Sequence, residues 1–111
     1  MNIHYTFTKL SQFFVNEYLP LLNEEIASLE KKMAALEQFE TVPEEEKRRV
    51  SEQIEAYKRL RFEFEEGLRL SESILSGEVS NDVTRISVIK KLEALTVLMD
   101  LTNGTSSDVT D

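Results

Sequence analysis

The side chains that could do chemistry are one histidine and two pairs of glutamates. His4 is the single histidine, and a catalytic triad, a histidine-rich zinc site or a di-iron bundle requires more ligands or better placed ones. The sequence has no cysteine, which excludes a thiol nucleophile, a cysteine zinc site and a disulfide framework. Glu37 with Glu40, and Glu63 with Glu66, have the spacing that places two carboxylates on one face of a helix.

Together the two glutamate pairs superficially resemble the metal-binding motif of the all-helical, magnesium-dependent nucleotide pyrophosphohydrolases. That motif is Glu-x-x-Glu followed later by Glu-x-x-Asp, and Glu66 departs from its aspartate. In the helical hairpin described next, the second pair lies about 28 Å from the first at 1.5 Å per residue. One metal ion cannot bind both pairs, so we predict no catalytic residue, no metal site and no cofactor.

Two long amphipathic helices are the strongest pattern in the sequence. Apolar side chains recur at alternating a and d positions of a heptad, and a second seam of the same period follows a turn near residues 39–41. The first seam is Val15, Leu19, Leu22, Ile26, Leu29, Met33 and Leu36. The second is Val50, Ile54, Tyr57, Arg61, Phe64, Leu68, Ser71 and Leu75. These seams predict an antiparallel hairpin with a coiled-coil-like tip.

Pro20 and Arg61 interrupt this hairpin at the same level. Proline lacks a backbone N–H and crowds the carbonyl four residues earlier, which predicts a kink or short break between Asn16 and Pro20. The Arg61 guanidinium has three possible positions: bound to the carbonyl of Asn16, paired with Glu17, or extended into solvent.

A third helix is predicted over residues 81–103. Ser80, Asn81 and Asp82 are candidate caps, and Asn103-Gly104 is a stop signal. Its apolar residues lie all round the helix, as in helices buried on more than one side. We expect it to run back along the second helix and to cover only the base of the hairpin, leaving residues 23–56 as a two-helix projection.

Residues 1–8 alternate between apolar and polar, which is the period of a half-buried strand. No other segment resembles a partner strand, and three interpretations remain: an extended arm on the helices, a strand paired with another chain, or an early start of the first helix. We predict an all-α fold: a three-helix bundle with a long antiparallel hairpin and an extended N-terminal arm. A single helical domain at 9–104, with helices near 9–38, 43–76 and 81–103, then separates the arm from a mobile tail at 105–111.

The net negative charge of the chain limits which partners it could bind. A net charge of −8, from 21 acidic and 13 basic residues, opposes direct binding to nucleic acid or an anionic membrane. With no signal peptide pattern and no membrane-length apolar run, we predict a cytoplasmic location.

The predicted function is non-enzymatic protein–protein interaction, as an adaptor, assembly chaperone or accessory subunit. In build, the hairpin is similar to secretion-system and flagellar chaperones. The alternative is an acidic inhibitor that occupies a basic, nucleic-acid-binding-like site on a target protein. A helical-bundle enzyme or small-ligand binder ranks third.

Two surfaces are predicted for these interactions. An apolar stripe exposed on a monomer would favour aggregation, so the third helix and the N-terminal arm predict a homodimer. The candidate oligomer interface is Ile3, Tyr5, Phe7, Ile86, Ile89, Val97 and Leu101. The candidate partner-binding residues are Phe39, Val42, Phe62 and Leu70.

Overall fold

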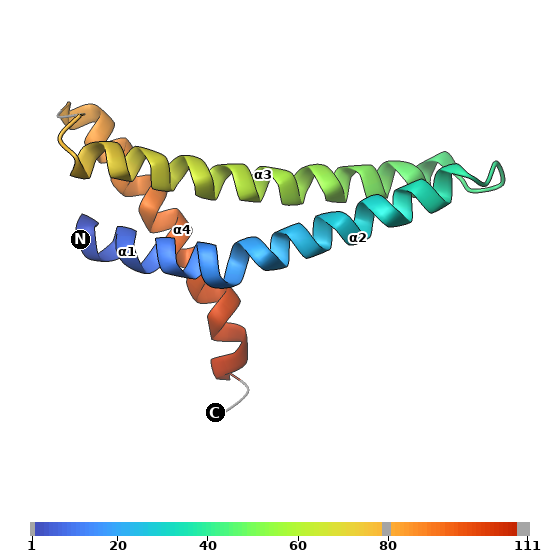
Figure 1. Ribbon diagram of the computed structural model, residues 1–111, viewed down its shortest axis with the longest axis horizontal. Coiled ribbons are helices and arrows are strands. Elements are labelled where there is room, and N and C mark those ends of the chain that lie inside the picture. The colour runs from blue at the N-terminus through green and yellow to red at the C-terminus, as the bar shows by residue number, and fades with distance from the viewer. Residues whose placement is uncertain (1, 79–80, 109–111) are drawn as a thin grey trace.

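The two heptad seams form a long antiparallel hairpin in the computed structural model (Figure 1). The structure describes residues 2–78 and 81–108, with side chains as far as residue 102. Every regular element in this part of the chain is a helix, which confirms the all-α prediction. The elements are α1 (Ile3–Phe13), the π-helix η1 (Phe14–Tyr18), α2 (Leu19–Glu37), α3 (Glu44–Leu75) and α4 (Asp82–Asp108). The first three form one bent rod that packs along α3.

The N-terminal arm is helical, so the predicted extended arm is wrong and the early helix start is correct. Asn2 is the N-cap of α1, and its side-chain Oδ1 accepts a hydrogen bond from the Tyr5 N–H at 3.0 Å. Ile3, Phe7 and Leu10 have helical spacing, and this face continues into the core through the buried Ile3 and Leu10. Burying that continuous apolar face favours a helix more than the apolar–polar alternation of residues 1–8 favours a strand.

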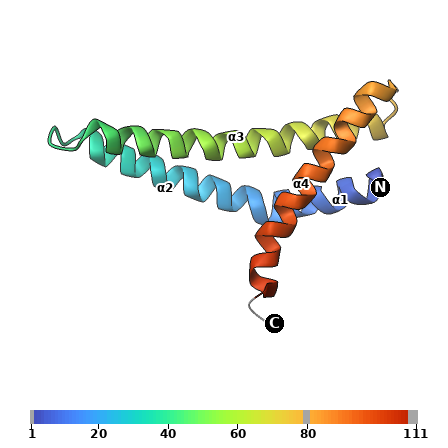
Figure 2. The same ribbon diagram turned by 180° about the vertical axis from the view of Figure 1, so that it is seen from behind.

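A π-helical segment precedes Pro20 and confirms the predicted irregularity. The Leu19 N–H donates to the Phe14 carbonyl, a bond that spans five residues instead of four. The wider turn accommodates a proline ring that would clash within a regular helix. Figures 1 and 2 both show the rod bending where α1 meets α2. The extra residue shifts the heptad register, so Tyr18 is buried while the predicted seam residue Val15 is exposed.

Helix ends follow ordinary capping chemistry. Gly77 has φ +84° after α3, and the Glu78 N–H donates to the Ser73 carbonyl at 3.0 Å, which closes a Schellman motif. Asn81 is confirmed as the cap of α4, since its Oδ1 accepts from the Val83 N–H at 2.8 Å; Ser80 lies outside the described residues.

The predicted stop of the third helix at Asn103-Gly104 is wrong. α4 continues to Asp108, because one glycine weakens a helix by about 1 kcal/mol without ending it. Residues 105–108 therefore belong to α4 and not to a separate tail, while residues 109–111 lie outside the described part of the chain.

The core lies at the base of the hairpin. Phe64 of α3 is fully buried and stacks on Phe14 at 5.0 Å between ring centroids, with Tyr18 at 5.2 Å and Phe13 at 6.1 Å. α4 closes this cluster with four buried side chains, Val88, Leu92, Leu95 and Met99. It covers only the base, as predicted, but crosses it obliquely instead of running back along α3 (Figure 1).

The distal half of the hairpin has a much thinner seam. Among its described residues only Ile26, Val50 and Ile54 are buried, and they lie outside the main core cluster. The molecule is therefore elongated, with extents of 55 × 39 × 20 Å and a radius of gyration of 17.7 Å, compared with about 13 Å for a compact chain of this length.

Candidate interaction surfaces

The tip of the hairpin presents one aromatic side chain. Phe39 lies in the loop between α2 and α3 and is 58% exposed. Its N–H donates to the Leu36 carbonyl at 3.2 Å, and its own carbonyl accepts from the Val42 N–H at 3.4 Å. These bonds tie the loop to the end of α2, with Val42 half-buried. The loop between α2 and α3, which contains Phe39, lies at the end of the molecule farthest from the core (Figure 1).

The acidic residues that begin α3 are neutralised locally. Each carboxylate of the Glu44–Glu46 triplet pairs with the cation three residues later on the same helix turn. The N···O distances are 3.7 Å for Glu44–Lys47, 2.6 Å for Glu45–Arg48 and 3.7 Å for Glu46–Arg49. The tip therefore has a mixed-charge surface and not a continuous acidic one.

Polar contacts link the two arms of the hairpin where the main core ends. The Arg61 Nη1 donates to the Asn23 Oδ1 at 2.9 Å in an exposed hydrogen bond. Of the three positions considered for this guanidinium, the bond to the Asn16 carbonyl and the pair with Glu17 are therefore wrong, and the side chain lies toward the surface but bound to Asn23. Farther along, the Lys58 Nζ lies 3.6 Å from the Glu30 Oε2. These exposed contacts fix orientation more than they add stability.

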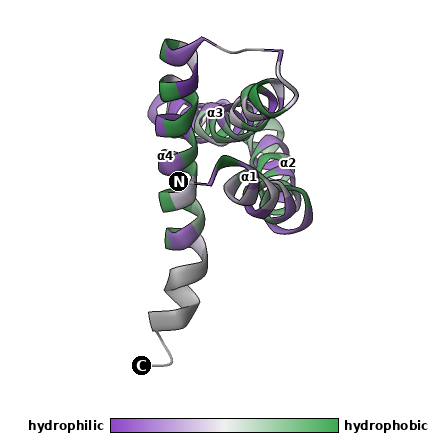
Figure 3. Ribbon diagram, turned by 90° about the vertical axis from the view of Figure 1, so that its left-hand side faces the viewer, coloured by the Kyte–Doolittle hydropathy of each residue, from purple (hydrophilic) through white to green (hydrophobic). Residues whose placement is uncertain are grey.

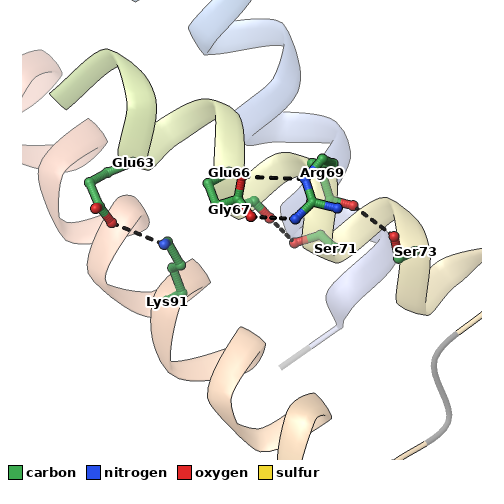
Figure 4. Close-up of polar contacts among 7 residues, drawn as sticks. All are labelled: Glu63, Glu66, Gly67, Arg69, Ser71, Ser73 and Lys91. Carbon is green, nitrogen blue, oxygen red and sulfur yellow. Dashed lines mark hydrogen bonds and ion pairs between the residues drawn. The ribbon is translucent and has the colours of Figure 1, made fainter. Parts of the chain in front are cut away.

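The close approach of α3 and α4 at their crossing depends on a glycine of α3. A Cβ added to Gly67 would lie 2.6 Å from the Leu95 Cδ1, so a larger residue here requires the Leu95 side chain to shift. One turn on, the buried Ser71 hydroxyl donates to the Gly67 carbonyl at 2.7 Å (Figure 4). This contact was not predicted, and its signal in the sequence is the Gly-x-x-x-Ser spacing on the buried face of α3.

Ion pairs flank this crossing. The Lys91 Nζ of α4 lies 3.0 Å from the Glu63 Oε2 of α3, and Arg69 binds the Glu66 carboxylate through two of its guanidinium nitrogens, Nε and Nη2 (Figure 4). Both carboxylates of this glutamate pair thus face cations of the protein, and Glu37 lies at the far end of α2. Within residues 2–78 and 81–102, no group of three or more acidic or histidine side chains is arranged to hold a metal ion.

The Glu66–Arg69 contact should lower the pKa of Glu66 by an amount that can be measured. The hydrogen bond from Arg69 lowers the pKa of Glu66 below its ordinary value. Because the folded pKa is lowered, the contact stabilises the fold above the ordinary glutamate pKa and is lost as the pH falls through the folded value. An NMR titration of the Glu66 carboxyl should give a low midpoint that returns to the ordinary range in Arg69→Gln. Arg59→Gln is the control, and an unchanged Glu66 midpoint in Arg69→Gln would contradict the assignment.

The outer face of α4 is apolar and open. Val83, Ile86, Val97 and Leu101 are all more than half exposed, on the side opposite the buried Leu92. In Figure 3, where the hairpin is viewed end-on, α4 runs lengthwise beside the other helices.

The predicted interface residues therefore separate into two groups. Ile3 is buried in the core of the chain, and Phe7 and Ile89 are half-buried. The exposed members are Tyr5, Ile86, Val97 and Leu101.

The four predicted partner-binding residues do not form one surface. Phe39 and Val42 lie in the tip loop, while Phe62 and Leu70 lie on α3 toward the base. Phe62 is 57% exposed, but Leu70 is half-buried against the core. The structure thus offers two separate candidate sites with one exposed phenylalanine each.

An open groove of about 420 Å³ lies between α1, η1 and α4. Its lining is Lys9, Gln12, Phe13, Asn16, Glu17 and Met99. All four polar side chains are exposed, so solvent already satisfies them and no convergent set of catalytic groups is formed.

Comparison with protein families, with curated proteins and with solved structures found no match. Among the described helices, none combines the length and the apolar composition needed to cross a bilayer.

Proposed function

We propose that this chain is a cytoplasmic, non-enzymatic interaction protein that presents the tip of its α2–α3 hairpin to another protein. It would serve as an adaptor, an assembly chaperone or an accessory subunit. The observation that supports this proposal is the hairpin itself: α2 and α3 extend beyond α4, and Phe39 is held exposed at their end (Figure 1).

The distal hairpin contributes little to the stability of the base. Its three buried side chains lie outside the main core cluster, whereas the base has aromatic stacking and a covering helix. A solitary exposed aromatic is common on protein surfaces, but Phe39 is also at the end of a projection that no other helix covers. Buried aromatic anchors dominate many protein–protein interfaces, and Phe39 is positioned to fill an apolar pocket.

The charges of the hairpin indicate what would surround that pocket. Residues 23–56 contain ten acidic and five basic residues, which is most of the net negative charge of the chain. A partner pocket with a basic or polar rim would complement this surface. The alternative, an inhibitor that mimics nucleic acid, has less support because Lys47, Arg48 and Arg49 directly follow the acidic triplet and pair with its carboxylates.

Site-specific photo-crosslinking tests which phenylalanine contacts the partner. A photoreactive phenylalanine analogue placed at Phe39 should capture one defined protein from native extract. The purified partner should then bind the wild type, and Phe39→Ala should weaken that binding by about tenfold or more. Phe62 is the matched control, because its exposed fraction is 57% against 58% for Phe39. Capture and loss of affinity at Phe62 alone would move the site to the base, and binding unaffected by either change would contradict the proposal.

The proposal includes a homodimer. Its support is the outer face of α4, which exposes apolar side chains along a helix whose opposite side is fully used by the core. Covering that face with a second copy would remove an aggregation-prone stripe from solvent. The hairpins would remain accessible, because they are separate from this face of α4 (Figure 3).

A further inference from the structure

We infer that the outer face of α4 is self-complementary and that a second copy docks on it antiparallel, with the two-fold axis on this outer face at the level of residue 92. This inference rests on the proposed homodimer and adds its surface, orientation and register. The surface, here named the outer stripe, consists of Val83, Ile86, Lys90, Ala94, Val97 and Leu101. At 100° per residue these positions share one side of α4, opposite Val88, Leu92, Leu95 and Met99, which are buried.

The residues of the outer stripe are arranged almost symmetrically about residue 92. Val83 and Leu101 are placed symmetrically about residue 92, as are Lys90 and Ala94, and Ile86 and Val97 differ from symmetry by one position. In an antiparallel pair each large apolar side chain would therefore face another one, and each Lys90 would face the small Ala94 of the partner subunit. A two-fold dimer requires such self-complementarity.

Charge favours the antiparallel orientation over the parallel one. A parallel pair in register would place Lys90 against the partner's Lys90 at the centre of the interface, which is repulsive. In the antiparallel register Lys90 lies beside the partner's Glu93. Lys90 and Glu93 are both exposed and make no ion pair within the described residues, so both are available for this contact.

The area of the outer stripe sets the expected affinity of the dimer. In the antiparallel register centred on residue 92, α4 overlaps its copy over residues 82–102, about 32 Å, so a helix pair about 10 Å wide covers roughly 300 Å² per copy, well under half of a standard interface and the size of a weak, transient contact. We therefore expect a dimer with micromolar affinity.

Two valines give a matched test of the surface. Val97 and Val15 are both 58% exposed, and only Val97 belongs to the outer stripe. Sedimentation equilibrium should show Val97→Glu weakening dimerisation by about 100-fold, because two buried carboxylates would meet the apolar stripe. Val15→Glu should dimerise like the wild type, and circular dichroism should show the same helix content for both. Equal loss in both variants, or a wild type that stays monomeric up to millimolar concentration, overturns the interface.

Cysteine pairing tests the orientation, since the natural sequence has no cysteine. Mixing Ile86→Cys with Val97→Cys should give a disulfide-linked heterodimer, because those positions face each other in the antiparallel register. Each variant alone should not link, as eleven residues of offset correspond to about 16 Å and a disulfide needs Cα atoms within about 7 Å. Linking of Ile86→Cys to itself would indicate a parallel pair and overturn the inference.

A charge exchange tests the register. Lys90→Glu and Glu93→Lys should each weaken self-association about tenfold, and a mixture of the two variants should form a heterodimer at least as strong as the wild type. No recovery in the mixture would contradict the Lys90–Glu93 contact. None of these substitutions touches the hairpin tip, so a failed dimer test leaves Phe39-dependent partner binding to be judged separately.

Discussion

Phe64→Ala is expected to destabilise the protein by about 3–5 kcal/mol, the cost of removing a large aromatic side chain from a closed core. Phe64 is fully buried and contacts three other rings, those of Phe13, Phe14 and Tyr18. These rings come from α1 and η1, while Phe64 comes from α3, so the cavity would separate the two arms of the base. For a domain of this size such a loss is a large part of the total stability.

Urea denaturation followed by circular dichroism measures this effect. Phe62→Ala is the control, because it removes the same side chain from an exposed position on the same helix and should change stability by less than about 0.5 kcal/mol. Similar midpoints for Phe64→Ala and Phe62→Ala would show that the aromatic cluster does not hold the base together.

Gly67→Val is expected to cost about 2–3 kcal/mol, although valine favours the helix more than glycine does. A Cβ at this position would lie 2.6 Å from the Leu95 Cδ1, and Leu95 is buried in the core with little room to move. The expected consequence is displacement of α4 from α3, with loss of the Lys91–Glu63 contact beside it.

A double-mutant cycle with Leu95→Ala isolates this clash. In the Leu95→Ala background the cost of Gly67→Val should fall below about 1 kcal/mol, because the colliding methyl group is absent. Equal costs in both backgrounds would mean that the valine acts through the helix backbone and not through the α3–α4 contact.

The heptad pattern was sufficient to predict the hairpin and its uneven thickness. Leu22 and Ile26 on α2 and Val50 and Ile54 on α3 are buried where the pattern placed them, because the apolar stripe has only one way to leave solvent in an antiparallel pair. The pattern failed at Val15, where the π-turn before Pro20 inserts a residue and rotates the register. A proline signals that some irregularity will occur, but several backbone geometries can accommodate it.

The N-terminal segment and the course of α4 were less accessible to sequence reasoning. Ile3 fits both a strand period and a helical face with Leu10, and only burial of that face against the core decides between them. The oblique crossing of α4 depends on the close approach at Gly67, and a contact between distant helices is not encoded in local periodicity. Phe39 and Phe62 were predicted as one partner-binding set because both are apolar. Their positions in the hairpin place them far apart, one in the tip loop and one toward the base.

Hydrogen–deuterium exchange of the purified chain is the most direct test of the central claim, which is that the base is the stable unit and the distal hairpin is an uncovered projection. Amides of α3 around Phe64 should exchange slowly, and those of residues 27–52 should exchange much faster through local opening. Exchange of the α4 amides should become slower as the protein concentration rises into the range where the dimer forms. Uniform protection from Leu10 through Ile74 would contradict this division, because it would mean that the tip is as well supported as the base and has no free surface to offer a partner.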